Sequence, residues 1–187
     1  DRDDNLYMTG GYKNNADFDI GPNSAILSSA GNTDVFIAKY KGSGTLKWAF
    51  SIGGSGSDSG NGIATDTIGN VYVTGSFSGT VDFDPSVGVA LLTAESSPDL
   101  FVAKYDTSGN YQWAFKIGGD GMVVSGKIGV DDDGNVYMVG SFGDTYFTGA
   151  SADTIDTDPG IGVNELVSDG SFEVFVAKYN TDGEHQW

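Results

Sequence analysis

The 187-residue chain contains no cysteine. This absence excludes disulfides, thiolate metal sites and a cysteine nucleophile, and it is compatible with an exported bacterial protein. There is a single histidine, His185, so a multi-histidine metal site is excluded as well. Zinc-type and thiol chemistry therefore have no ligands in this sequence.

Basic residues are scarce: 9 Lys and Arg stand against 26 Asp and Glu, for a formal net charge of -17. Nucleic acid is not an expected partner, because its binding depends on Lys and Arg that neutralise phosphates. Strong acidity favours solubility and attracts cations. No apolar run approaches the roughly 18 residues of a membrane span, so we expect a chain that is not membrane-embedded.

Helix signals are missing too, whereas glycine is plentiful, at 29 residues with only 4 prolines. The sequence instead repeats itself. Leu6–Gly10 returns as Val71–Gly75 and Val136–Gly140, and a Phe-(Ile/Val)-Ala-Lys-Tyr motif ends at Tyr40, Tyr105 and Tyr179. The tyrosines of the first motif give a period of 65 residues (72 − 7 and 137 − 72). Such a period indicates one supersecondary unit stacked on copies of itself.

Each unit shows four strand signals separated by a tight turn, a long excursion and a second tight turn. The strands are short runs of β-branched, aromatic and small residues. In the middle copy they cover 62–66, 71–77, 100–105 and 111–117. A four-stranded antiparallel unit at fixed period predicts an all-β fold of β-propeller blades, about three of them in an incomplete ring. A solenoid is the alternative, although its usual period is shorter, at roughly 20–50 residues.

Small residues in 62–66 predict the innermost strand, next to the propeller axis. Trp48, Trp113 and Trp187 recur in the last strand of each copy, and we expect them to fill the interfaces between blades. Lys39, Lys104 and Lys178 also recur. We expect them to pair with the acids at Asp34, Asp99 and Glu173 or to lie at a solvated edge.

The run from Ile52 to Asp66, continued through Gly69–Gly75, closely resembles the bacterial SBBP (seven-bladed β-propeller) repeat. The Phe-Val-Ala-Lys-Tyr segment and its Ser-Gly-Asn turn also match that family. The Asp-Phe-Asp-Pro excursion at 82–85 looks like a variant of secreted and surface proteins of Bacteroidetes-type bacteria. The resemblance implies an extracellular propeller protein, and it implies no reaction.

Alignment of the copies gives expected blades at 1–54, 55–119 and 120–187, all within one propeller segment. Asp1 aligns with Asp66 at the end of an inner strand, and Trp187 aligns with Trp113 early in an outer strand. On this interpretation the first blade lacks its inner strand and the outer strand of the third is truncated. We therefore expect a mature or excised segment, completed by the remaining blades of the same polypeptide or by other subunits.

Paired aspartates mark the excursion of every copy. Alternate residues of an extended segment point to one side, so each pair could converge on Ca²⁺, a hard cation that prefers oxygen ligands. The alternative is that these carboxylates accept backbone amides and shape the loop. The predicted metal residues are Asp17, Asp19, Asp82, Asp84, Asp156 and Asp158. The run 131–135 also resembles a cation loop, but its counterpart Asp66–Asn70 keeps one carboxylate and favours a simple turn.

The symmetry is broken by nine extra residues between Tyr137 and Asp156. Repeat proteins concentrate such variation on one face, often the binding face. Tyr146 and Phe147 in this insertion are the predicted ligand-binding residues, suited to carbohydrate or protein. Neutral drift of a tolerant loop is the alternative.

No residue is predicted to be catalytic, and we do not expect an enzyme. His185 stands where the other copies have Tyr111 and Leu46, which indicates a surface substitution rather than a member of a triad. We expect an extracellular or cell-surface module for binding, adhesion or scaffolding. The alternatives are part of an enzyme whose catalytic residues lie outside this segment, and a subunit of a self-assembling surface fibre.

Overall fold

The computed structural model describes residues 1–95, 98–143 and 153–187. These residues form strands and turns, with no helix among them, and therefore no helix that could cross a membrane. The strands are β1 (Asn5–Tyr12), β2 (Asn15–Asp17), β3 (Ile26–Ser28), β4 (Asp34–Lys41), β5 (Leu46–Ile52), β6 (Ser59–Thr65), β7 (Val71–Phe77), β8 (Thr80–Asp82), β9 (Leu91–Thr93), β10 (Asp99–Tyr105), β11 (Tyr111–Gly119), β12 (Met122–Val130), β13 (Val136–Gly143), β14 (Thr154–Asp156), β15 (Glu165–Val167) and β16 (Glu173–Tyr179).

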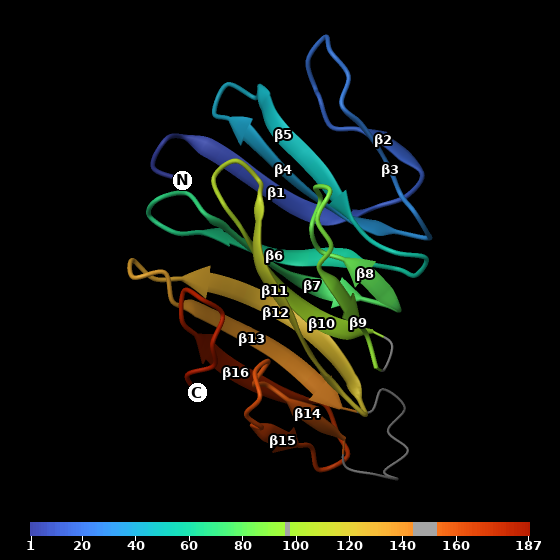
Figure 1. The fold of residues 1–187 in the computed structure, drawn as a ribbon, viewed down its shortest axis with the longest axis vertical. Coiled ribbons are helices and arrows are strands. Elements are labelled where there is room, and N and C mark those ends of the chain that lie inside the picture. Colours follow the sequence, from blue (N-terminus) through green and yellow to red (C-terminus); the bar gives the residue numbers. More distant parts are fainter. Residues whose placement is uncertain (96–97, 144–152) are drawn as a thin grey trace.

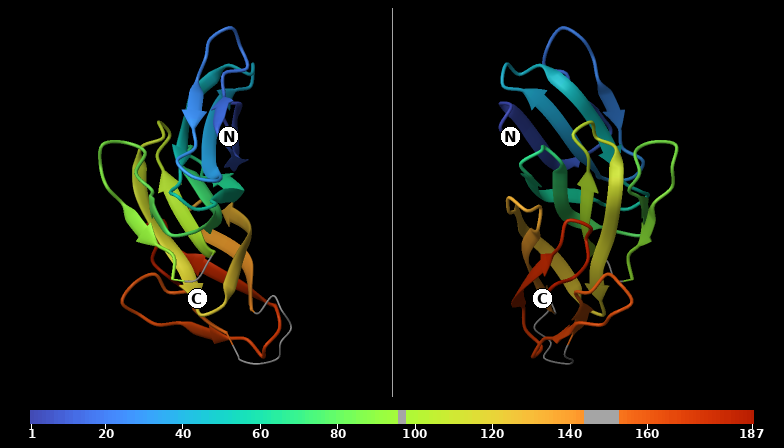
Figure 2. Two further views of the ribbon diagram at one scale, coloured as in Figure 1. Left: turned by 90° about the vertical axis from the view of Figure 1, so that its right-hand side faces the viewer. Right: turned by 60° about the vertical axis from the view of Figure 1, so that its left-hand side comes forward.

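Three antiparallel sheets follow one another down the long axis of the molecule (Figure 1). The first has the order β1-β4-β5, the second contains β6-β7-β10-β11, and the third has the order β12-β13-β16. The two further views show the sheets stacked face against face in an open, unclosed arrangement (Figure 2). The chain is thus an all-β partial propeller, and its sheets are successive blades.

Local sequence explains the blade. β7 and β10 are β-branched, aromatic and small residues that are buried on both faces, as expected for strands between two neighbouring sheets. β6 is different: it lies beside β1 and β12, at the edge of its sheet. A Cβ at Gly62 would lie 3.3 Å from the backbone nitrogen of Ile128 in β12. The inner strands therefore approach so closely that small residues are required there.

Each excursion folds back as a short hairpin, formed by β2-β3, β8-β9 and β14-β15. The third hairpin also pairs with the preceding blade, since Gly118 and Gly119 of β11 face Asp156 and Ile155 of β14. Two buried clusters form the core. One contains side chains of the first two sheets together with Phe83 of the second excursion, and the other joins the second and third sheets.

Candidate functional site

Both junctions between blades are closed by the same two donors. At the first, Lys39 Nζ and Trp48 Nε1 donate to the carbonyl oxygen of Thr107, at 3.2 and 3.3 Å. At the second, Lys104 Nζ and Trp113 Nε1 donate to the carbonyl oxygen of Thr181, at 2.8 and 3.1 Å. The acceptor belongs in each case to the turn before the last strand of the next blade. These repeated residues hold neighbouring blades together.

Each of these lysines also lies over a tyrosine ring of its own blade, Lys39 over Tyr7 at 4.9 Å and Lys104 over Tyr72 at 5.1 Å. Burial lowers the pKa of Lys104, because a charged amine is disfavoured away from water. The expected pairing with Asp34 and Asp99 was wrong. The side chains reach across to a carbonyl group of the next blade rather than along their own sheet.

The aromatic rings of one blade pack against a glycine in the same turn of the next blade. Gly109 has φ +87°, and a Cβ there would lie 3.2 Å from the Phe50 ring and 3.4 Å from Trp48. Gly183 has φ +83° and the same relation to Trp113 and its neighbouring phenylalanine. The expectation that the tryptophans fill blade interfaces is confirmed for Trp48 and Trp113 by these contacts.

The paired aspartates of the excursions accept backbone amides. Oδ1 of Asp82 accepts the N–H groups of Asp84 (3.1 Å) and Ala90 (2.8 Å), and Oδ1 of Asp84 accepts that of Ser86 (2.8 Å). The other two hairpins repeat this pattern. The equivalent acceptors are Asp17 and Asp19 in the first copy and Asp156 and Asp158 in the third.

These bonds shape the hairpins, as the loop interpretation expects. The backbone N–H groups of Ala25 and Asp19 lower the pKa of Asp17, because they stabilise the ionised form. The described residues contain no group of three or more Asp, Glu, His or Cys side chains that could hold a metal ion. Calcium binding stays a prediction.

Asp131 belongs to a turn. Its Oδ1 accepts the N–H groups of Asp133 (3.0 Å) and Asn135 (2.8 Å), and its Oδ2 accepts the Asn135 side chain (2.8 Å) and the Tyr137 hydroxyl (3.0 Å). Asp66 makes the equivalent bonds in the middle copy. This geometry favours the turn interpretation over a cation loop.

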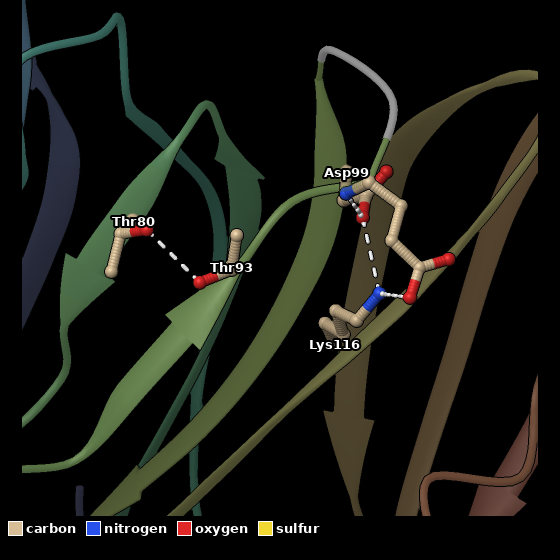
Figure 3. A network of polar contacts seen from close by, with 5 residues as sticks. Thr80, Thr93, Asp99 and Lys116 are labelled. Carbon is tan, nitrogen blue, oxygen red and sulfur yellow. Dashed lines mark hydrogen bonds and ion pairs between the residues drawn. The ribbon is translucent and has the colours of Figure 1, made fainter.

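A groove lies beside β11, the last strand of the second blade, and the copies differ at some of the residues that line it. Lys116 Nζ lies 2.8 Å from Glu95 Oε1 and 3.6 Å from Asp99 Oδ2 (Figure 3). The first copy has Ser51 and Ala30 in place of Lys116 and Glu95. One cavity of about 420 Å³ here shares four residues with a second of about 410 Å³. The shared residues are Ala114, Phe115, Asp158 and Pro159.

His185 lines the second of these cavities together with Asp182 and Glu184. Its ring packs edge-on against Tyr179, with 5.6 Å between centroids, and its Nε2 lies 3.3 Å from Asn164 Nδ2. The side chain is half-buried and lines the groove rather than an open surface.

The sequence did not lead us to predict this groove, although the residues that depart from the repeat could have indicated it. Tyr146 and Phe147 lie outside the described residues.

Comparison with known proteins agrees with this architecture. A WD repeat-containing protein, L264, of Acanthamoeba polyphaga mimivirus, itself uncharacterized, is 33% identical over 189 residues, or 96% of this chain and 13% of that protein. Regulatory protein FlaEY of Caulobacter vibrioides is 28% identical over 160 residues, or 83% of this chain and 15% of that protein. The chain therefore spans less than a sixth of either relative.

Residues 48–76 match the family model SBBP, described as a beta-propeller repeat. This stretch runs from the last strand of the first blade into β7 of the second, and so contains the junction between them. The 65-residue period places the same elements again at the second junction. Residues 48–76 thus carry an SBBP beta-propeller repeat.

Proposed function

We propose that this chain is a scaffold segment of a larger extracellular or cell-surface protein, and that it works in binding or adhesion. One observation carries the proposal: contacts between blades use residues that recur in the copies, whereas the groove beside β11 includes lining residues at which the copies differ, namely Glu95, Lys116 and His185. The first blade packs with Ser51 and Ala30, so Lys116 and Glu95 are not needed for blade packing. Residues that packing does not require are available to recognise a ligand.

The groove suits a carbohydrate or a segment of another protein. Ala114 and Phe115 line both cavities, and the lining also includes carboxylates, Lys116 and His185. A small number of placed polar groups around an apolar floor is the usual composition of a ligand site. The net charge of -17 and the absence of cysteine are compatible with an exported protein.

Exchange of groove residues for those of the other copies tests this proposal. Lys116→Ser and His185→Tyr introduce residues that other copies carry, and circular dichroism checks that each variant folds. We expect binding to glycan and peptide arrays to weaken at least about tenfold. Exposed Lys13→Ala is the control. Unchanged binding by both variants would exclude the groove as the ligand-binding site. The double variant Tyr146→Ala and Phe147→Ala then tests whether the insertion binds the ligand. Retained binding would exclude the insertion as the site.

A second kind of partner is another copy of the unit. On the third sheet Val174 and Val176 are 73% and 57% exposed, whereas their equivalents Leu100 and Val102 are fully covered by the next blade. We propose that a further blade, in the same polypeptide or in another subunit, covers this face. Light scattering of this chain alone and of a longer stretch of the polypeptide distinguishes the two sources. Concentration-dependent head-to-tail assembly supports the fibre alternative.

Location is tested separately from binding. Protease treatment of intact cells of the source organism should remove the protein if it lies on the surface, while a cytoplasmic marker survives. Protection of the protein in intact cells, with digestion after lysis, would contradict an extracellular role.

The alternative function is that of an enzyme whose catalytic site lies elsewhere in the longer protein. It predicts an enzymatic activity that the groove variants leave unchanged.

A further inference from the structure

The pocket that contains His185 has a counterpart at the first junction. A cavity of about 290 Å³ lies there, and every residue that lines it has an equivalent in the lining of the cavity of about 410 Å³ at the second junction. The equivalent of Phe50 is 65 positions on, and the other equivalents are 74 positions on because the nine-residue insertion intervenes. The pairs are Phe50 and Phe115, Asp84 and Asp158, Pro85 and Pro159, Ser86 and Gly160, Gly109 and Gly183, Asn110 and Glu184, and Tyr111 and His185.

Each pocket is built by two blades. The phenylalanine belongs to the last strand of one blade, whereas the other paired residues belong to the excursion and to the turn before the last strand of the next blade. The left view of Figure 2 shows the hairpins β8-β9 and β14-β15 projecting on the same side of the stack. One pocket is therefore present at each junction, and the packing of two blades creates it.

Three rings stand in the same order beside both pockets: a phenylalanine, a buried tyrosine and the ring that follows the turn. At the first junction the successive centroids are 5.0 and 6.3 Å apart, and at the second they are 4.7 and 5.6 Å apart. The rings are Phe50, Tyr105 and Tyr111 at the first junction and Phe115, Tyr179 and His185 at the second. The two pockets thus share an aromatic frame.

The central tyrosine also fixes the excursion in place. The Tyr105 hydroxyl donates to the carbonyl oxygen of Phe83 at 2.9 Å, and the Tyr179 hydroxyl donates to that of Thr157 at 2.7 Å. These acceptors directly precede the aspartate of each pocket. Burial raises the pKa of both tyrosines, so their hydroxyl groups stay protonated donors. The pockets are therefore organised before a ligand arrives, which lowers the cost of ordering on binding.

Each pocket offers one carboxylate oxygen as a hydrogen-bond acceptor. Oδ1 of Asp84 and Oδ1 of Asp158 each accept the backbone N–H two residues on, at 2.8 Å. Among the described residues, no hydrogen bond ends on Oδ2 of either aspartate, and both side chains are half-buried. A Cβ at Gly88 or at Gly162 would overlap this second oxygen. Glycine at both positions therefore keeps a side chain away from it.

The features that the pockets share favour a neutral ligand with hydroxyl groups. Both combine aromatic and proline carbon with one open carboxylate oxygen, which complements the C–H and O–H groups of a sugar. Their charge is not shared, because Asp84 is the carboxylate of the first pocket whereas Asp158, Asp182 and Glu184 line the second. Recognition by positive charge would therefore not use both pockets alike. The net charge of -17 also disfavours an acidic polysaccharide.

We propose that the two pockets bind two stretches of one neutral polysaccharide, which makes this chain a bivalent carbohydrate-binding module. This inference rests on the function proposed above for the groove, and it adds the first pocket and the class of ligand. A polymer of identical units can fill equivalent pockets at once, and binding to both raises the overall affinity about 10²–10⁴-fold. The first pocket is the weaker site, because the groove at the second junction continues into the cavity that Lys116 lines.

A titration of the wild-type chain tests the proposal without any substitution. The probes are the neutral trisaccharides maltotriose, cellotriose and chitotriose, and the backbone amide signals of Gly109 and Gly183 report on the two pockets. We expect one of the sugars to shift both signals, that of Gly183 at concentrations at least about tenfold lower. A shift at Gly183 alone would leave the groove as a single site and overturn the bivalent arrangement. No shift with any of the three sugars would contradict the proposed function of the groove as well.

Variants taken from the repeat test each pocket separately. Tyr111→Leu and His185→Leu introduce the residue that the first copy carries as Leu46, and circular dichroism checks that each variant folds. Calorimetry with the trisaccharide that binds should show half as many molecules bound per chain for either variant as for wild type. Capture by the matching insoluble polymer should weaken about a hundredfold in either variant. Lys13→Ala is the control and should change neither measurement. Stoichiometry and capture that Tyr111→Leu leaves at the wild-type level would overturn the first pocket while leaving the groove.

Discussion

Gly109 performs two separate tasks at the first junction. Its φ of +87° is one that side chains disfavour, and the rings of Trp48 and Phe50 occupy the space where a Cβ would stand. Gly44, in the corresponding turn of the first blade, has φ +84° but meets only Ile20, at 3.4 Å. The two glycines therefore separate backbone strain from packing between blades.

We predict that Gly44→Ala costs about 1–2 kcal/mol from left-handed backbone strain. Gly109→Ala should cost about 1 kcal/mol more, because the methyl group also displaces the aromatic rings. Urea unfolding of both variants measures the difference. Equal losses of stability in the two variants would mean that Gly109 is needed for its turn and not for packing at the junction.

Lys104 joins its own blade to the next one. Lys104→Met keeps the aliphatic stem and removes the ammonium group, which donates to Thr181 and lies over Tyr72. The expected loss of stability is about 1–2 kcal/mol. Lys178→Met is the matched control, since Lys178 contacts the Tyr137 ring without a following blade in this chain. A larger effect of the control would contradict the bridging role.

Carboxylates in turns and loops give the fold a pH dependence. The Asn135 side chain lowers the pKa of Asp131, and the Ala25 amide lowers that of Asp17. Stability from these groups is present above about pH 3.9 and is lost as pH falls through the lowered values. Unfolding midpoints below pH 4 should therefore drop less steeply for Asp131→Asn than for wild type. Parallel curves would exclude Asp131 as a source of acid sensitivity.

At the scale of elements, one aspartate oxygen in each excursion hairpin accepts two backbone amides. Asp82→Ala removes the acceptor for two backbone amides and should cost about 1 kcal/mol. Asp82→Asn keeps an acceptor oxygen and should cost less. Thermal unfolding with Ca²⁺ and with chelator completes the test, and the turn interpretation predicts no difference between them. A rise in melting temperature with Ca²⁺ that Asp82→Asn abolishes would support the calcium prediction instead.

The long strands could be predicted from sequence, and the hairpins could not. Val71–Phe77 carries a continuous β-branched and aromatic pattern, and the predicted bounds equal those of β7. The strands β8 and β9 have three residues each, which is too short for any periodicity to be read. The pairing of β14 with β11 joins residues distant in sequence, so no local signal marks it.

The candidate site shows the same division. Repetition identified Lys104 as scaffold but gave the wrong partner, because the acceptor is a main-chain carbonyl of another blade that has no sequence signature. Lys116 and His185 are departures from the repeat, but Lys116 was not predicted as a site residue and His185 was predicted to be a surface substitution. Their burial and contacts required the three-dimensional arrangement.

At the scale of the whole molecule, each of the first two blades is covered by the blade that follows it. Val102 is fully buried by the following blade, whereas Val176 at the equivalent position is 57% exposed. Val102→Asp should therefore cost about 3–5 kcal/mol, because it buries an unpaired charge. Val176→Asp in the 187-residue chain should change stability by less than about 0.5 kcal/mol. Similar effects of the two changes would contradict a stack that is open at this face.

An experimental structure of the longer polypeptide in which we propose that this chain lies is the most direct test. We predict that a further blade covers Val174 and Val176, and that Lys178 Nζ and Trp187 Nε1 donate to one carbonyl oxygen in its turn. A structure in which this face is exposed to solvent, or is covered by an unrelated fold, would contradict it.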